Sequence, residues 1–118
     1  MSTRPTTIDT TELPELITSY LRAHGARDLD VAVRSYAPDA TVVDEGRTYR
    51  GPDEIRGWLS RSASEYTYTV EITGAAKVGE DGYDVMQHLE GDFPGGVVDL
   101  HFRFLLRDGT IIRLVIEE

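Results

Sequence analysis

Asp44 is the residue whose type and position best suit acid–base chemistry. It ends the apolar segment Ala40–Asp44 and is followed by Glu45-Gly46, a pair typical of a turn. A carboxylate at the end of a buried strand can be drawn into a pocket, where the loss of water makes it usable as a general base. Alternation puts Asp44 on the same strand face as Val42. Both faces are partly apolar, however, so a solvated turn residue is the competing interpretation.

Tyr20, His88 and Glu90 are the other candidates for chemistry. Tyr20 lies in the middle of an apolar helical stripe, so its ring should be buried and its hydroxyl needs a partner. That hydroxyl could donate to a developing oxyanion, or it could bond to the backbone of an ordinary core. His88 and Glu90, two residues apart on one strand face, could share a proton or steer a ligand. Alternatively, they belong to an exposed charged face.

Three helices are predicted in the N-terminal half, where they would position these side chains. Apolar residues recur at helical spacing over Leu13–Ala26. A second, short helix starts at the N-cap residue Asp28, carries Tyr36 on its buried face and ends before the next proline. The third helix begins at Gly51-Pro52 and buries Trp58.

The remainder of the chain predicts antiparallel strands separated by turn signals such as Asp108-Gly109. Besides residues 40–44, the expected strands are Tyr66–Thr73, Ala75–Val78, Tyr83–Asp92, Val97–Arg107 and Thr110–Glu117. Helices followed by a meander of strands indicate an α+β fold with the helices on one face of the sheet. Long twisted strands curl, so the concave end of this sheet is the expected site. We expect one domain over residues 11–118, after a disordered N-terminus of residues 1–10.

Composition argues against several functions. The absence of cysteine rules out disulfides, thiolate catalysis and cysteine-bound zinc. Twelve basic residues against 21 acidic ones give a net charge of −9, which argues against nucleic acid as a partner. The three histidines lack metal-site spacing and no phosphate loop is present, so we expect no metal and no cofactor. No apolar run suits a membrane span and no signal peptide is visible, which predicts a cytoplasmic protein.

The order of these motifs resembles the nuclear transport factor two-like superfamily. Two helices lead into Tyr-Ala-Pro-Asp-Ala-Thr-Val-Val-Asp at 36–44, followed by Arg-Gly-Pro-Asp-Glu-Ile at 50–55, and Phe-Leu-Leu-Arg-Asp-Gly-Thr-Ile stands at 104–111. Within that superfamily the chain is similar to SnoaL-like polyketide cyclases and ketosteroid isomerases. The resemblance implies a cystatin-like α+β roll: a cone-shaped, curved antiparallel sheet with three N-terminal helices packed on its concave face. It also implies an apolar pocket and a homodimer that forms through the sheet.

The resemblance further implies roles for individual residues. Asp44 lies where ketosteroid isomerases carry their general base, and Tyr20 lies where they carry an oxyanion-donating tyrosine. The ligand-pocket residues that it implies are Trp58, Phe102, Val42, Met86, Glu90 and, as a third catalytic candidate, His88.

Two functions follow as hypotheses. The first is an acid–base isomerase or cyclase acting on a small apolar carbonyl compound. Asp44 would take a proton α to the carbonyl, and Tyr20 or His88 would stabilise the enolate. The second is a non-catalytic homodimeric module of the same fold, which binds a ligand or assists association. A purely structural domain would instead fill its pocket with side chains such as Trp58 and Tyr20.

Overall fold

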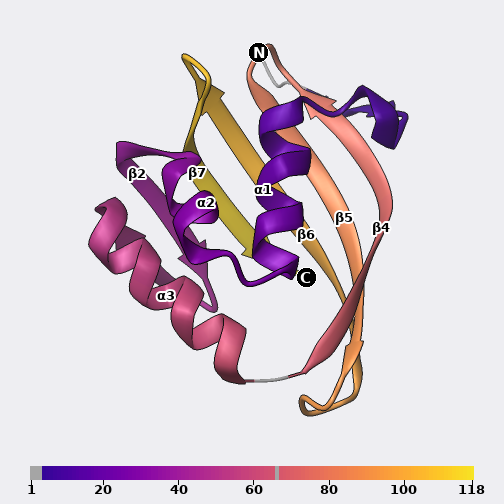
Figure 1. Ribbon diagram of the computed structural model, residues 1–118. Coiled ribbons are helices and arrows are strands. Elements are labelled where there is room, and N and C mark those ends of the chain that lie inside the picture. The colour runs from indigo at the N-terminus through magenta and orange to yellow at the C-terminus, as the bar shows by residue number, and fades with distance from the viewer. Residues whose placement is uncertain (1–3, 66) are drawn as a thin grey trace.

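Three helices cover one face of a curved sheet in the computed structural model, which describes residues 4–65 and 67–118 (Figure 1). The helix α1 spans Glu15–Gly25 and lies within the curve of the sheet. The short helix α2 spans Leu29–Arg34 and starts where Asp28 accepts a hydrogen bond from the backbone N–H of Val31. The helix α3 spans Gly51–Glu65. All three predicted helices are therefore present.

Seven strands form one sheet in the described part of the chain, in the order β1-β4-β5-β6-β7-β2-β3. Their bounds are Thr6–Ile8 (β1), Tyr36–Asp44 (β2), Arg47–Arg50 (β3), Tyr68–Val78 (β4), Gly82–Gly91 (β5), Val97–Arg107 (β6) and Thr110–Glu117 (β7). The predicted α+β class and the curved sheet are confirmed. The sheet is not purely antiparallel, because β2 and β7 are parallel neighbours. A parallel pair needs a long connection, which here runs through β3, α3 and the rest of the sheet.

The core lies between α1, α3 and the concave face of the sheet. Its fully buried side chains include Ile17 and Tyr20 from α1 and Ile55 from α3. The sheet contributes residues that alternate along each strand, such as Val85 on β5 and Leu114 on β7. Helical and strand periodicity thus place these apolar residues on the two surfaces that meet in the core.

The first residues of the chain differ from the prediction of a disordered N-terminus. Residues Thr6–Ile8 pair with β4, and Asp9 caps a short 3-10 helix over Thr10–Glu12. The Asp9 carboxylate accepts from the backbone N–H of Thr11 at 3.0 Å, and Glu12 Oε2 accepts from the N–H of Asp9 at 2.8 Å. The prediction is therefore wrong for residues 6–10. Residues 1–3 lie outside the described part.

Three predicted boundaries also change. The second helix ends at Arg34 and Tyr36 opens β2, because the Ser35 carbonyl accepts a hydrogen bond from the Ile111 N–H of β7. The two strands predicted around Gly74 form one strand, β4, with a register shift at this point. The predicted start of that strand at Tyr66 lies outside the described residues. The hairpin strand β3 was not predicted.

Substitution of Gly82 tests how tightly the β4–β5 connection is packed. A Cβ at residue 82 would lie 2.4 Å from the carbonyl oxygen of Val78. We expect Gly82→Ala to lower the free energy of unfolding by about 2 kcal/mol in urea titrations, because backbone must move to relieve the overlap. Gly25→Ala is the matched control, since a Cβ there meets nothing within 4 Å. Equal stability of the two variants would contradict this packing.

Candidate functional site

Asp44 faces the concave side of the sheet, at the end of β2. It pairs with Ile116 of β7, and Ile116 pairs with Phe102 of β6, so the three side chains form a row on one face. The indole Nε1–H of Trp58 on α3 donates to Asp44 Oδ2 at 2.9 Å. The turn after Asp44 has positive φ at both central residues, Glu45 and Gly46, as a tight hairpin requires. That hairpin leads through β3 into α3 and so places Trp58 above Asp44.

Tyr20 is fully buried and has a side-chain partner rather than a backbone one. The hydroxyl of Tyr36 donates to the hydroxyl of Tyr20 at 2.5 Å, and the two rings meet edge to face. Burial raises the pKa of Tyr20, so its hydroxyl keeps its proton at neutral pH. Because it accepts from Tyr36, Tyr20 can still donate that proton elsewhere. Tyr20 lines neither of the cavities described below.

His24 occupies the centre of the site, one helical turn after Tyr20. Its ring centroid lies 5.9 Å from those of Tyr20 and Trp58 and 6.2 Å from that of Phe102. Burial lowers the pKa of His24 to about 4, so the imidazole is neutral at pH 7. The sequence pattern marks His24 only as a member of the same helical stripe as Tyr20, which carries no functional signal of its own.

Two small cavities adjoin His24. The larger, about 30 Å³, is lined by His24, Gln87, Phe102, Tyr68 and apolar residues from α1, β4 and β5. The smaller, about 10 Å³, also touches His24 and Tyr68 and lies against α2. Since a water molecule needs roughly 10–15 Å³ of such space, the larger cavity holds a small cluster of atoms at most. An organic ligand therefore requires the lining side chains to move.

The concave face is uncovered near the start of β4. Val70 and Ile72 pair with Leu89 and Gln87, so they share the concave face, yet they are 41% and 36% exposed. Residues on this face elsewhere, such as Val85, are fully buried under the helices. The larger cavity adjoins Val70. This uncovered apolar edge is the natural route from solvent to the cavity.

The prediction that Met86, His88 and Glu90 face the pocket is wrong. They alternate with the buried residues Val85, Gln87 and Leu89 and therefore lie on the outer face of the sheet. His88 Nδ1 lies 2.7 Å from Asp99 Oδ1, and its Nε2 lies 3.3 Å from Glu90 Oε1. Phe102 pairs with Val85, so the register of the sheet puts Phe102 and Met86 on opposite faces.

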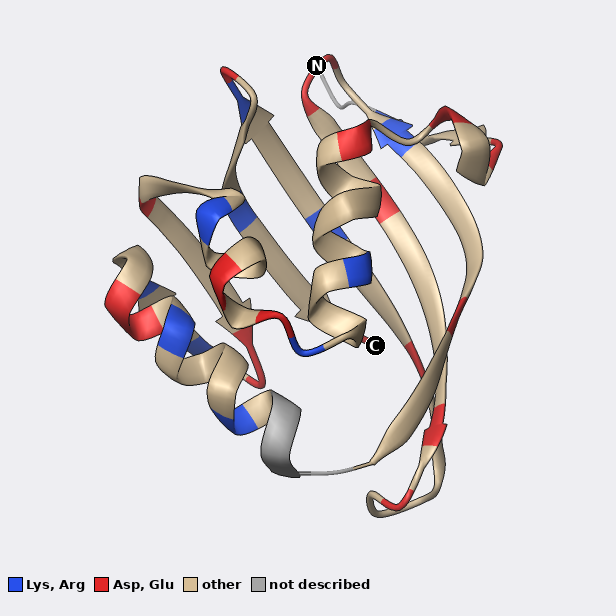
Figure 2. Ribbon diagram, viewed as in Figure 1, with Lys and Arg blue, Asp and Glu red and all other residues tan. Residues whose placement is uncertain are grey.

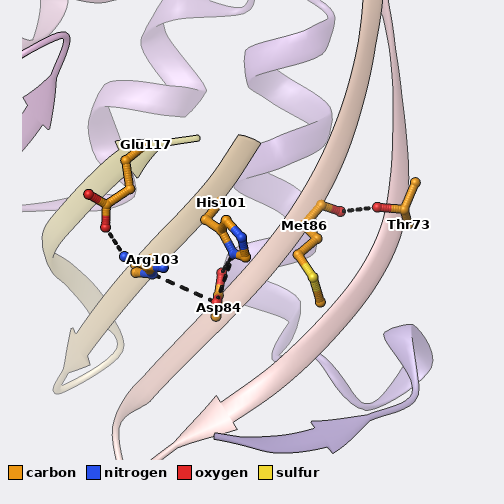
Figure 3. A network of polar contacts seen from close by, with 6 residues as sticks. All are labelled: Thr73, Asp84, Met86, His101, Arg103 and Glu117. Carbon is orange, nitrogen blue, oxygen red and sulfur yellow. Dashed lines mark hydrogen bonds and ion pairs between the residues drawn. The ribbon is translucent and has the colours of Figure 1, made fainter. Parts of the chain in front are cut away.

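The outer face carries a polar network of its own (Figure 3). Asp84 accepts from His101 Nδ1 at 3.0 Å and lies 3.7 Å from Arg103 Nε, and Arg103 also pairs with Glu117. Met86 lies beside these residues, on the opposite side of the sheet from the helices. These outer residues belong to the charged face that sequence alternation offered as the alternative for His88.

The other predicted pocket residues lie on the concave side. Trp58 is 4% exposed and bonded to Asp44, and Phe102 lines the larger cavity. Val42 is fully buried in the core and lines neither cavity. The structure thus brings Asp44, Trp58, Tyr20 and Phe102 around His24.

Lys and Arg are scattered over several helices and strands and do not gather on one element (Figure 2). None of the described helices combines the length and apolarity that crossing a bilayer requires. In the described ranges, no group of three His, Asp or Glu side chains is arranged to hold a metal ion.

The sequence and the fold match those of one protein family. The sequence profile of the SnoaL-like domain matches residues 17–114, so the chain belongs to the SnoaL-like domain family. The solved structure of a candidate polyketide cyclase from Sinorhizobium meliloti is 31% identical to this chain, with a TM-score of 0.87. The alignment covers 93% of this chain and 100% of that one. No curated protein sequence matches the chain.

More distant structures share the fold. A protein of ketosteroid isomerase-like fold from Catenulispora acidiphila, in complex with trimethylamine, has 24% identity and a TM-score of 0.77 over 89% of this chain and 85% of that one. A Mycobacterium tuberculosis protein in complex with estradiol-17β-hemisuccinate has 16% identity and a TM-score of 0.74 over 87% and 90%. At these identities the likeness shows the nuclear transport factor two-like fold alone.

Burial of neutral His24 makes stability depend on pH. The pKa of His24 falls from 6.5 in the unfolded chain to about 4 in the folded protein, so the unfolded chain binds more protons between these values. Stability should therefore fall as the pH drops from 6.5 to 4, by about 3 kcal/mol from this group. His24→Leu should lose correspondingly less stability over the same range in urea titrations.

His88 changes stability with pH in the opposite direction to His24, but it is present in both wild type and His24→Leu. Its hydrogen bonds to Asp99 and Glu90 raise its pKa, so its contribution is present at low pH and is lost as the pH rises. The difference between wild type and His24→Leu therefore isolates His24. Parallel stability profiles for the two proteins would show that the imidazole is not buried in its neutral form.

Proposed function

We propose that this SnoaL-like protein binds a small apolar carbonyl compound in its concave interior and acts on it by acid–base catalysis. The observation that carries the proposal is the placement of Asp44, an acid on the concave face that is held by the Trp58 indole at 2.9 Å. A carboxylate positioned by a single hydrogen bond keeps lone pairs for a substrate proton. The apolar surroundings favour a substrate whose body is hydrocarbon.

The proposed reaction is proton transfer next to a carbonyl group. The Asp44 carboxylate takes a proton from the α carbon, and the electrons of that C–H bond form an enolate. The Tyr20 hydroxyl, which accepts from Tyr36 and is kept protonated by burial, donates to the enolate oxygen. Where a C=C bond is conjugated with the enolate, return of the proton at the far carbon of the dienolate gives an isomer. Attack of the enolate carbon on a second carbonyl, with return of the proton to the new alkoxide, gives an aldol cyclisation. Because Tyr20 lines neither cavity, the interior must open before it can donate.

A non-catalytic, ligand-binding or association module is the second candidate function. The filled interior favours it, because Tyr20 and Trp58 are 0% and 4% exposed and the larger cavity measures about 30 Å³. The two candidates differ in whether bound ketone exchanges its α protons.

Deuterium exchange tests the catalytic proposal without knowledge of the natural substrate. Wild type in D₂O should accelerate exchange at the α carbons of 2-decalone, a two-ring ketone, as followed by NMR. Asp44→Asn should slow the catalysed exchange by about 100-fold or more, since it removes the base. Asp39→Asn is the matched control, because Asp39 lies on the same strand but is exposed and paired with Arg107.

Binding is measured in the same samples through Trp58, the single tryptophan, whose indole touches Asp44. Binding of 2-decalone without exchange would favour the non-catalytic module. Exchange that is unchanged in Asp44→Asn would show that Asp44 is not the base.

We further propose that the protein forms a homodimer through the outer face of its sheet. Val97 and Leu105 on β6 are 57% and 40% exposed on this face, and Arg103 and Glu117 can pair across a two-fold axis. In sedimentation experiments, wild type should have twice the 13.2 kDa mass of the chain. The double variant Val97→Glu/Leu105→Glu should sediment as a monomer. A monomeric wild type would contradict the proposal.

A further inference from the structure

Two polar side chains in the larger cavity have no hydrogen-bond partner among the described residues. Gln87 on β5 is 4% exposed, and His24 on α1 is largely buried. Neither makes a hydrogen bond to any residue in the described part of the chain. All fully buried polar atoms of the described residues do have partners. The amide of Gln87 and the ring nitrogens of His24 are therefore open to the cavity that both residues line.

Packing does not explain a glutamine at position 87. Its neighbours on the same strand face, Val85 and Leu89, are buried and apolar, and its cross-strand partners are Ile72 and Leu100. An apolar side chain would fit this pattern, whereas an amide that faces only a small cavity and has no partner among the described residues costs stability. A costly polar group that points into a cavity indicates a role in binding.

The chemistry of the cavity selects the kind of group that it can bind. A glutamine amide and a neutral imidazole each offer one donor and one acceptor function. The remaining lining is apolar apart from the Tyr68 hydroxyl, and no charged side chain of the described residues lines this cavity. A carboxylate or an ammonium group would lose its hydration here without gaining a counter-ion. A neutral hydroxyl or carbonyl group would be matched by the available donors and acceptors.

We propose that Gln87 forms a recognition subsite for a neutral hydroxyl or carbonyl group at the end of the ligand remote from Asp44. His24, which contacts Trp58 and lines the same cavity as Gln87, lies between the two ends and offers a second polar group. The inference rests on the proposed function, namely that the concave interior binds a small apolar compound. In the sheet, β5 is three strands away from β2, a separation of about 14 Å between backbones at ~4.8 Å per strand. The ligand thus has an apolar body of two or more rings between two polar ends.

Two matched ketones test this subsite through the fluorescence of Trp58. Decalin-2,6-dione has a carbonyl group at each end, and 2-decalone lacks the second one. Wild type should bind the dione about tenfold more tightly, the value of one additional hydrogen bond in a buried site. Gln87→Leu should bind both ketones equally, and decalin-2-carboxylate should bind more weakly than 2-decalone to wild type.

The control variant is Met86→Leu, which changes the neighbouring residue on the outer face and should keep the tenfold preference. Gln87→Leu should also unfold at a higher urea concentration than wild type, because it removes an unpaired buried amide. A less stable Gln87→Leu would show that the amide has a structural partner and would overturn the subsite.

The binding results separate the two levels of the proposal. If wild type binds 2-decalone but Gln87→Leu keeps the preference for the dione, the subsite is wrong and the proposed function stands. If wild type binds neither ketone, the proposed function fails and the subsite fails with it.

Discussion

The parallel pairing of β2 with β7 is the constraint on which the site depends. It joins the second strand of the chain to the last one and sets Asp44 opposite Ile116, in the row that continues to Phe102. The same pairing anchors the β2–β3 hairpin, from which α3 departs directly at Gly51. A one-residue shift in this register would turn Asp44 to the outer face and remove its bond to Trp58. The acid, its hydrogen-bond donor and the wall of the cavity are thus set by one strand pair.

The few polar groups that lie among the apolar side chains near that acid are uncharged. The Tyr36 hydroxyl donates to that of Tyr20, and burial keeps both hydroxyls protonated. His24 is neutral for the same reason, and Gln87 has no charge to lose. Hydrogen bonds are stronger in such surroundings than in water, and groups without partners are correspondingly costly. The described pairs between acidic and basic side chains, such as Asp84 with Arg103, lie on the outer face or at the periphery instead.

The fold was largely predictable because short-range sequence patterns specify most of its helices and turns. Helical spacing in residues 13–26, the cap at Asp28 and the Asp108-Gly109 turn each specify one local conformation. The predictions fail where contacts with residues distant in the sequence determine the local conformation. Tyr36 fits a helical stripe, but pairing with β7 draws it into β2. The Glu45-Gly46 turn adopts the same positive φ values as Asp108-Gly109, and only the partner strand shows that it closes a hairpin.

The site was predictable in part. The sequence alone determined that Tyr20 is buried, that Trp58 belongs to a core-facing helix and that Asp44 ends an apolar strand, since these properties follow from periodicity within single elements. It could not determine which face of β5 lies under α1, because His88 and Gln87 alternate and both faces contain polar residues. The tertiary structure decided this by the pairing of Val85 with Phe102, which sends His88 outward and leaves Gln87 beside His24. The inward face of a strand is a property of its neighbours, and the neighbours of β5 come from segments far away in the chain.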